Sequence, residues 1–253
     1  MCIRDRYVLS PKMTPLEIAG DLQDATPTEV VFTILPGWRL EEIGASLPTS
    51  GLEVRPEEFL ALAGSPPSNH PLAAEIPAGA TLEGFFLAGS YTLPRAIDDA
   101  AFIDTLLDRF NEEVGGDIRQ GFDRRSLSLY EGVTLASIVQ KESVVQEEMP
   151  LIASVFLNRL EAGIKLDSDP TVQYALGLDG EPATWWKSPL SLNDLQVASP
   201  YNTYQNPGLP PGPIASPTLA ALQAVAYPAQ TPYFYFRAAC DGSGRHTFAE
   251  TFE

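Results

Sequence analysis

The spacing of hydrophobic positions divides the first half of the chain into a strand and several helices. Residues 30–35 are rich in β-branched and aromatic side chains and are followed by Pro36-Gly37, which predicts a strand that ends in a turn. Apolar residues then recur at helical spacing over the ranges 40–47, 56–63 and 98–114. A Pro-rich loop is expected between these helices, at 65–80, followed by an aromatic-rich segment at 83–94.

The second half has longer helical patterns and ends in a hairpin signal. Helices are predicted over 134–145, over 148–162 with Gly163 as the stop, and over 218–226. Ser168-Asp169-Pro170 predicts a further short helix, with Asp169 as its cap and Pro170 as its first residue. Strand-like segments at 233–238 and 245–249 flank a Gly-rich turn. This mixture has no regular βαβ alternation and predicts an α+β fold.

The N-terminal residues follow a different pattern. Residues 7–23 are interpreted as the end of a strand and a short helix, with Thr14 as N-cap and Pro15 at the first helical position. The first six residues, MCIRDR, match nothing that follows and are not a signal peptide, because no apolar stretch comes after them. We expect them to be non-native.

Glu142 is the most informative single residue. Within the predicted helix 134–145, Leu135, Ile138 and Val139 share one face with Glu142. A carboxyl group on such an apolar face loses water, which raises its pKa and allows it to act as a general acid near neutral pH. The alternative is that Glu142 marks the helix end and turns to water, because charged residues are rarely buried unless paired.

Composition and charge exclude several other functions. The net charge of −17 argues against nucleic-acid binding, which needs clustered basic residues. With only two histidines and two cysteines, a histidine-rich metal site and a disulfide framework are not expected. No apolar stretch reaches the roughly 18 residues of a membrane span. No G-x-S-x-G or phosphate-binding loop is present, so carboxylate chemistry remains.

A second informative segment is the loop from Tyr201 to Pro213. Prolines and glycines fix its backbone, and it carries Tyr201, Tyr204, Asn202 and Asn206. Aromatic faces and amides suit the C–H faces and hydroxyl groups of a sugar, although a rigid linker packed on the core has the same composition. Asn158, on the second long helix, is either a surface residue or a partner of Glu142.

Several motifs in fixed order resemble a known family. They are LASIVQKES at 135–143, ASVFLNRL at 153–160, LDSDPTV at 166–172, SPYNTY at 199–204, GLPPGPI at 208–214, TPYFYF at 231–236 and GRHTF at 244–248. Together they resemble the YceG-like (MltG) family, the endolytic murein transglycosylases of the bacterial cell envelope. The likeness covers about residues 7–253 and is densest after Val133. Residues 87–91 read LAGSY where the family commonly has Phe-Pro-Asp-Thr-Tyr, and Ser143 replaces a frequent threonine.

The resemblance implies a reaction and a set of site residues. The implied reaction cleaves the MurNAc–GlcNAc bond within a glycan strand and leaves a 1,6-anhydro-MurNAc end, without a cofactor or metal. The family's catalytic glutamate falls on Glu142. The residues that the resemblance implies for substrate binding are Glu83, Ser143, Glu148, Asn158, Ser168, Asp169, Gln173, Tyr201, Asn202, Thr203, Tyr204 and His246.

The resemblance also implies an organisation and a location. Residues 1–27 are expected to hold the non-native head and the remnant of a LysM-like subdomain. Residues 28–126 should form the N-terminal, small α/β part of the YceG-like region, and 127–253 a C-terminally truncated, mainly helical catalytic domain with short strands. Glycan strands of peptidoglycan are the expected partner, with cell-wall synthases as protein candidates. The expected location is the extracytoplasmic face of the plasma membrane, through an N-terminal anchor that this chain lacks.

Two other functions are compatible with the same residues. One is a non-catalytic peptidoglycan-binding or scaffold module of the cell-wall synthesis machinery. The other is a muramidase that uses a second carboxylate, from Glu83, Glu148 or Asp169, and releases reducing ends.

Overall fold

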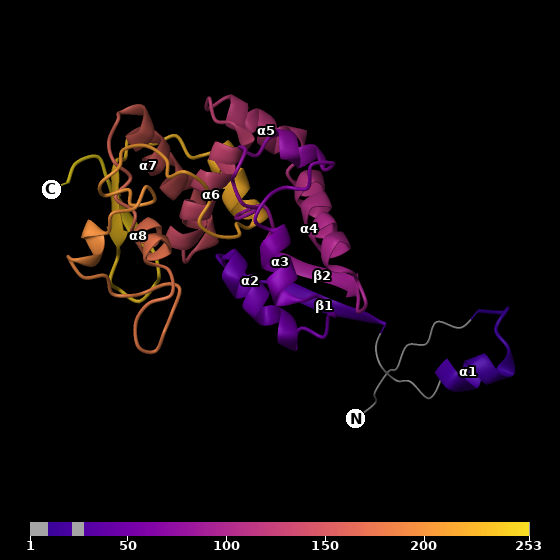
Figure 1. The fold of residues 1–253 in the computed structure, drawn as a ribbon. Helices are drawn as coiled ribbons and strands as arrows, with labels where there is room; N and C mark the ends of the chain where they lie inside the picture. Colours follow the sequence, from indigo (N-terminus) through magenta and orange to yellow (C-terminus); the bar gives the residue numbers. More distant parts are fainter. Residues whose placement is uncertain (1–9, 22–27, 253) are drawn as a thin grey trace.

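The computed structural model of the 253-residue chain describes residues 10–21 and 28–252 (Figure 1). The helices are α1 (Pro15–Asp21), α2 (Leu40–Ser46), α3 (Pro56–Leu62), α4 (Asp99–Glu113), α5 (Gly116–Asp123), α6 (Leu129–Glu142), α7 (Met149–Glu161), α8 (Asp169–Leu176) and α9 (Leu219–Ala226). The strands are β1 (Glu29–Ile34), β2 (Gly89–Pro94), β3 (Tyr235–Ala238) and β4 (His246–Ala249). Short 3-10 turns are η1 (Leu47–Thr49), η2 (Pro71–Ala74), η3 (Gln146–Glu148) and η4 (Asp194–Gln196). Helices combined with two antiparallel strand pairs confirm the α+β class.

The first strand pair joins segments that lie far apart in the sequence. β1 and β2 run antiparallel, with Phe32 opposite Tyr91. Alternate side chains point inward, so Phe32, Ile34 and Leu93 are buried while their neighbours face solvent. β2 lies in the segment that the sequence marked only as aromatic-rich, because its glycine, serine and proline weaken the strand pattern.

Helix α6 lies at the centre of the fold, between the β1–β2 pair with α2 to α4 on one side and α7, α8 and the β3–β4 hairpin on the other (Figure 1). It packs against α5, α7, α8 and α9. Every residue from Gly132 to Val139 is buried, so this helix has no solvent face in that stretch.

The observed ends of α6 differ from the predicted range 134–145. The helix begins at Leu129 because Ser128 and Glu131 form a capping box: the Ser128 hydroxyl accepts from the Glu131 amide, and the Glu131 carboxylate accepts from the Ser128 amide. It ends at Glu142, because Ser143 has an extended backbone (φ −95°, ψ 123°). Glu142 is therefore both on the apolar face and at the helix end.

Other differences from the predicted elements are small. Helix α5 was missed, because two glycines and several charges hide its apolar positions. The N-cap of α8 is Ser168, and Asp169 is the first helical residue, so the predicted cap was wrong by one position. Helix α1 begins at Pro15 as predicted. The six N-terminal residues and the start of the predicted strand at Tyr7 lie outside the described residues.

The proposed boundary near residues 126 and 127 stays a prediction. Buried hydrophobic side chains form one cluster that includes Phe32, Phe102, Phe122 and Ile138, and so extends across this position. Within residues 10–21 and 28–252, no helix combines the length and apolar character needed to cross a membrane.

Gly132 tests how tightly α6 is packed. A Cβ at this position would lie 2.5 Å from Cδ2 of the buried Phe122 ring. Alanine gains about 1 kcal/mol in helix propensity, but overpacking costs about 1–3 kcal/mol and the ring has no room to retreat. We expect Gly132→Ala to lower the free energy of unfolding, measured by urea denaturation. Gly116→Ala, where the new Cβ meets nothing within 4 Å, is the matched control and should not lower it.

Candidate active site

Glu142 opens into a hollow of about 300 Å³ that several elements build together. The hollow lies between the end of α6, helix α7, the start of α8, the loop at Tyr204 and the β3–β4 hairpin. Its lining residues are Glu142, Arg159, Leu166, Asp167, Asp169, Tyr204, Phe236, Arg237, Ala238 and His246. Four of the predicted site residues therefore line the hollow, namely Glu142, Asp169, Tyr204 and His246, and a fifth, Ser168, hydrogen-bonds Glu142.

The Glu142 carboxyl group is partly exposed to the hollow but crowded by protein on its other sides. This loss of water raises its pKa to about 7. The hydroxyl of Ser168, which donates to Oε1 over 2.6 Å, lowers the pKa, and the negative charge of Asp169 raises it. His246 and Arg159 also lower it, but burial outweighs them. A carboxyl group with this pKa carries a proton in a large fraction of molecules at neutral pH.

Ser168 is held in place by the loop that the sequence marked as informative. The Ser168 amide donates to Oγ1 of Thr203 over 3.0 Å. Thr203 is in turn hydrogen-bonded through Oγ1 to Oγ1 of Thr171, over 2.8 Å, and all three residues are buried. Thr203 and Thr171, from two different segments, therefore fix the position of Ser168, whose hydroxyl bonds Glu142.

Asp169 and Tyr204 form a second pair at the wall of the hollow. The Tyr204 hydroxyl donates to Oδ1 of Asp169 over 2.6 Å. Burial, together with this hydrogen bond, raises the pKa of Tyr204, so its hydroxyl stays protonated. Both side chains can hydrogen-bond the hydroxyl groups of a sugar.

Glu148 and His246 join the β4 strand to the start of α7. The backbone amide of His246 donates to both Glu148 oxygens, over 3.2 and 3.1 Å, and its ring Nδ1 lies 3.0 Å from Oε2. Glu148 is buried and does not line the hollow, whereas His246 does.

Other predicted residues of the 199–206 segment shape the loop rather than the surface of the hollow. The Asn202 side chain is fully buried; its amide nitrogen donates to the carbonyls of Leu195 and Val197, and its oxygen accepts from the Tyr204 amide. The Tyr201 ring packs on Tyr174, with centroids 4.7 Å apart. The alternative of tyrosines packed on the core thus describes Tyr201, but not Tyr204.

Three further predicted residues lie outside the lining of the hollow. Asn158 donates to the carbonyls of Thr231 and Tyr233, so it fixes the segment before β3 and is neither a free surface residue nor a partner of Glu142. The amide of Gln173 donates to the carbonyl of Lys187, and the hydroxyl of Ser143 donates to the carbonyl of Val145. Their substrate-binding roles remain predictions.

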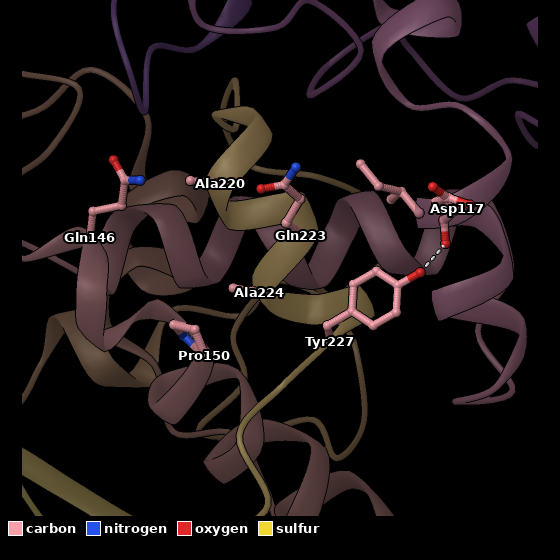
Figure 2. A pocket seen from close by; sticks show the side chains of 8 residues that line it. Asp117, Gln146, Pro150, Ala220, Gln223, Ala224 and Tyr227 are labelled. Atoms are coloured by element: carbon pink, nitrogen blue, oxygen red, sulfur yellow. Dashed lines mark hydrogen bonds between the residues drawn. The ribbon is translucent and has the colours of Figure 1, made fainter.

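A separate surface hollow of about 570 Å³ contains none of the predicted site residues (Figure 2). It lies between α5, α9 and the start of α7, and its lining includes Gln146, Pro150, Gln223 and Tyr227. The Tyr227 hydroxyl donates to the backbone carbonyl of Asp117 (Figure 2). Across the described parts of the chain, no group of three or more His, Cys, Asp or Glu side chains is arranged to hold a metal ion.

Comparison with known proteins decides the family. Residues 4–253 match the model of the YceG-like family. The chain belongs to the YceG-like family. A crystal structure of a yceG-like protein from Listeria monocytogenes has the same fold, with a TM-score of 0.74 and 29% identity over 98% of this chain and 81% of that one.

Two curated relatives of this YceG-like chain carry the name endolytic murein transglycosylase. The protein of Bacillus subtilis (strain 168) is 39% identical over 119 residues, which is 47% of this chain and 31% of the relative. The protein of Streptococcus pneumoniae serotype 2 (strain D39 / NCTC 7466) is 31% identical over 155 residues, which is 61% of this chain and 28% of the relative. The matched part thus spans less than a third of each relative.

Sequence reasoning missed three charged residues that line the hollow. Arg159 follows Asn158 in the ASVFLNRL motif, and its guanidinium donates to the carbonyls of Phe234 and Leu166. Asp167 has a left-handed backbone (φ 47°) and lies 3.8 Å from Arg159. Arg237 is exposed on β3. The first two lie within quoted motifs, but no pattern marked Arg237.

Glu83 of this YceG-like chain is a second carboxyl group with a raised pKa, but it lies away from the hollow. Its Oε2 accepts from the Leu40 amide over 3.2 Å, whereas Oε1 has no hydrogen-bond partner among the residues that the structure describes. Burial raises the pKa to about 8, the Leu40 amide and Arg39 lower it, and Glu41 raises it. Glu83 therefore joins α2 to the segment before β2 as an uncharged group.

We predict that Glu83 makes stability depend on pH. The folded form keeps its proton up to about pH 8, whereas the unfolded chain releases it near the ordinary pKa of 4.5. The stabilisation is therefore complete below pH 4.5 and is lost as pH rises to 8, at about 1.4 kcal/mol per pH unit. In urea denaturation at several pH values, the free energy of unfolding should fall less steeply with rising pH for Glu83→Gln than for the wild type.

Glu57→Gln removes the same chemical group from the exposed surface of α3 and serves as the control. Glu142 has a raised pKa of the same sign, so the difference between wild type and Glu83→Gln, rather than the slope itself, reports on Glu83. If the free energy of unfolding depended on pH equally in the wild type and in Glu83→Gln, the prediction would be contradicted.

Proposed function

We propose that this YceG-like chain carries the catalytic centre of an endolytic peptidoglycan lytic transglycosylase. The observation that carries the proposal is Glu142, a carboxyl group with a pKa of about 7 at a polar hollow. The relatives named endolytic murein transglycosylase support the same assignment. The substrate is then the glycan strand of peptidoglycan, and the bond that breaks joins MurNAc to GlcNAc.

The hydrogen bond from Ser168 decides which oxygen of Glu142 holds the proton. Oε1 accepts from the Ser168 hydroxyl, so in the neutral acid the proton is on Oε2. No residue in the described ranges hydrogen-bonds Oε2, so this oxygen is available to the substrate. The geometry therefore favours proton donation from Oε2 to the oxygen of the leaving GlcNAc.

A single carboxyl group is sufficient for the complete reaction. As the C1–O bond breaks, the GlcNAc oxygen takes the proton of Glu142. The resulting carboxylate then takes the proton of the MurNAc 6-hydroxyl as that oxygen bonds to C1, which closes the 1,6-anhydro ring and restores the acid. Intramolecular attack by this hydroxyl has a high effective molarity and replaces water as the nucleophile.

Positive charge that develops at C1 needs stabilisation. The carboxylates of Asp167 and Asp169 line the hollow and provide a negative field at the reacting bond. The acetamido group of the substrate is the other candidate for this role.

Substitution of Glu142 tests the role of the acid itself. Glu142→Gln keeps the shape of the side chain and an oxygen that can accept from Ser168, but the amide cannot donate and recover a proton. We expect turnover to fall by about 10²–10⁴-fold, with the thermal unfolding transition retained. The measurement is the yield of anhydro-ended fragments from purified glycan strands by mass spectrometry. Glu147→Gln, on an exposed neighbouring residue, is the control and should keep full activity.

The pH dependence of the rate tests the protonation state of Glu142. Because the protonated form of Glu142 is the active one, kcat/KM should fall above about pH 7, by about tenfold per pH unit. The Ser168 hydroxyl lowers the pKa of Glu142, so Ser168→Ala should move this fall to higher pH. A profile that stays flat from pH 5 to 9, or moves to lower pH in Ser168→Ala, would be incompatible with the proposed acid.

A muramidase with two carboxylates is the second candidate, because Asp169 lines the same hollow as Glu142. Product analysis separates the two reactions. A muramidase releases reducing ends, whereas a lytic transglycosylase releases anhydro ends. A protein that binds glycan strands without cleaving them would instead be a non-catalytic peptidoglycan-binding or scaffold module.

The proposed substrate implies a place in the cell envelope. Peptidoglycan lies outside the plasma membrane, so the catalytic hollow must face that side. Cell-wall synthases, which produce the glycan strands, are the candidate protein partners.

A further inference from the structure

Glu148 and His246 form a buried carboxylate–imidazole pair beside the reacting carboxyl group. His246 lines the same hollow as Glu142, while Glu148 lies behind it and has no share in the lining. The two side chains are 7% and 10% exposed, so their mutual hydrogen bond is shielded from water.

The hydrogen bonds of Glu148 determine which ring nitrogen of His246 carries a proton. An ionised carboxylate only accepts, so the ring must donate to it through Nδ1–H over 3.0 Å. In the neutral ring the other nitrogen, Nε2, then holds a free lone pair. No residue in the described part of the chain donates to Nε2 or accepts from it.

The ring cannot easily adopt another orientation. It packs edge-on against Phe236, with centroids 5.3 Å apart, and lies 6.4 Å from the ring of Phe248. The backbone amide of His246 is also tied to Glu148, so β4 and the ring are fixed by the same carboxylate. A purely structural link between β4 and α7 would need only the backbone bonds. The ring bond adds control of the tautomer.

The charged groups around the pair are compatible with this assignment. Arg245 forms a salt bridge with Glu148, with its Nη1 3.8 Å from Oε1. Arg237, on β3 beside the His246 strand, and Arg159 also line the hollow and can only donate hydrogen bonds.

We propose that Nε2 of His246 accepts a hydrogen bond from a sugar hydroxyl of the bound glycan, and that Glu148 is a positioning residue that fixes the required tautomer. This inference rests on the proposed function, which identifies the glycan strand as the substrate. The bond orients the sugar relative to Glu142, and no proton is transferred to His246. Glu148 thus acts on the substrate only through the imidazole ring.

The test uses the inactive Glu142→Gln protein, so that glycan binds without being cleaved. Long-range ¹H–¹⁵N NMR distinguishes the two nitrogens of each histidine ring, and the chain has only two histidines. At pH 8.5 we expect Nε2 of His246 to carry no proton, because Nδ1 donates to Glu148. Addition of a (GlcNAc–MurNAc)₂ tetrasaccharide should shift this resonance and leave the ring signals of His70 unchanged.

Two substitutions in the same background separate positioning from structure. His246→Asn keeps an N–H that can reach Glu148 but has nothing at the place of Nε2. Glu148→Gln keeps an acceptor for the backbone amide but allows its own N–H to donate to Nδ1, which moves the ring proton to Nε2. Each should weaken tetrasaccharide binding by about tenfold or more, as measured by calorimetry, since 1.4 kcal/mol corresponds to a factor of ten. Thr247→Ala, on an exposed residue of β4, is the control.

The outcomes are distinguishable from those of the proposed function. A protonated Nε2 in the neutral ring, or an Nε2 resonance that does not respond to saturating tetrasaccharide, would overturn the inference even if the wild-type enzyme is active. Unchanged affinity in His246→Asn would do the same. If the wild-type chain binds tetrasaccharide through His246 but yields no anhydro ends, the reaction assigned to Glu142 is wrong and the binding role of His246 stands.

Discussion

The site depends on the point at which α6 ends. Ser143 leaves the helical conformation, so Glu142 is the last residue of a helix that is buried all round from Gly132 to Val139. The apolar face carries the carboxyl group into the protein, and the helix end opens one side of it to the hollow. The C-terminus of a helix also carries partial negative charge, which disfavours an adjacent carboxylate. Burial and position on the helix thus raise the pKa in the same direction.

A raised pKa is useful in catalysis only if the proton has a fixed position. The Ser168 hydroxyl occupies Oε1, and Ser168 is itself held by Thr203 and Thr171. Thr203 belongs to the loop whose shape Asn202 maintains through its buried amide. Residues that do not line the hollow therefore decide which oxygen of Glu142 is left free of a protein hydrogen bond. This explains how a loop can be essential to the site while most of its side chains do not face the hollow.

The sequence predicted the fold class and most helices, because their apolar spacing is set by local geometry. It missed α5, whose glycines and charges obscure that spacing, and β2, whose pairing with β1 is a long-range contact. For the site, the motifs drew attention to Glu142, Asp169, Tyr204 and His246, which the structure brings together. They could not separate residues that line the hollow from those that support it, such as Asn202 and Glu148, since both kinds occur in the same motifs. Arg237 carried no signal, because an exposed arginine on a short strand has no distinctive pattern.

Glu83 and Glu142 show why an altered pKa does not by itself identify an acid catalyst. Burial raises the pKa of both carboxyl groups, to about 8 for Glu83 and to about 7 for Glu142. Glu83 is enclosed, with one oxygen bonded to the Leu40 amide and the other without a partner in the described part of the chain, so no substrate can collect its proton. Glu142 has one oxygen held by Ser168 and the other available to the hollow. The enclosed Glu83 is expected to make the stability of the fold depend on pH. At Glu142 the same loss of water raises the pKa of a carboxyl group whose proton is accessible from the hollow. Accessibility of the protonated oxygen, rather than the size of the pKa shift, is what distinguishes the catalytic candidate.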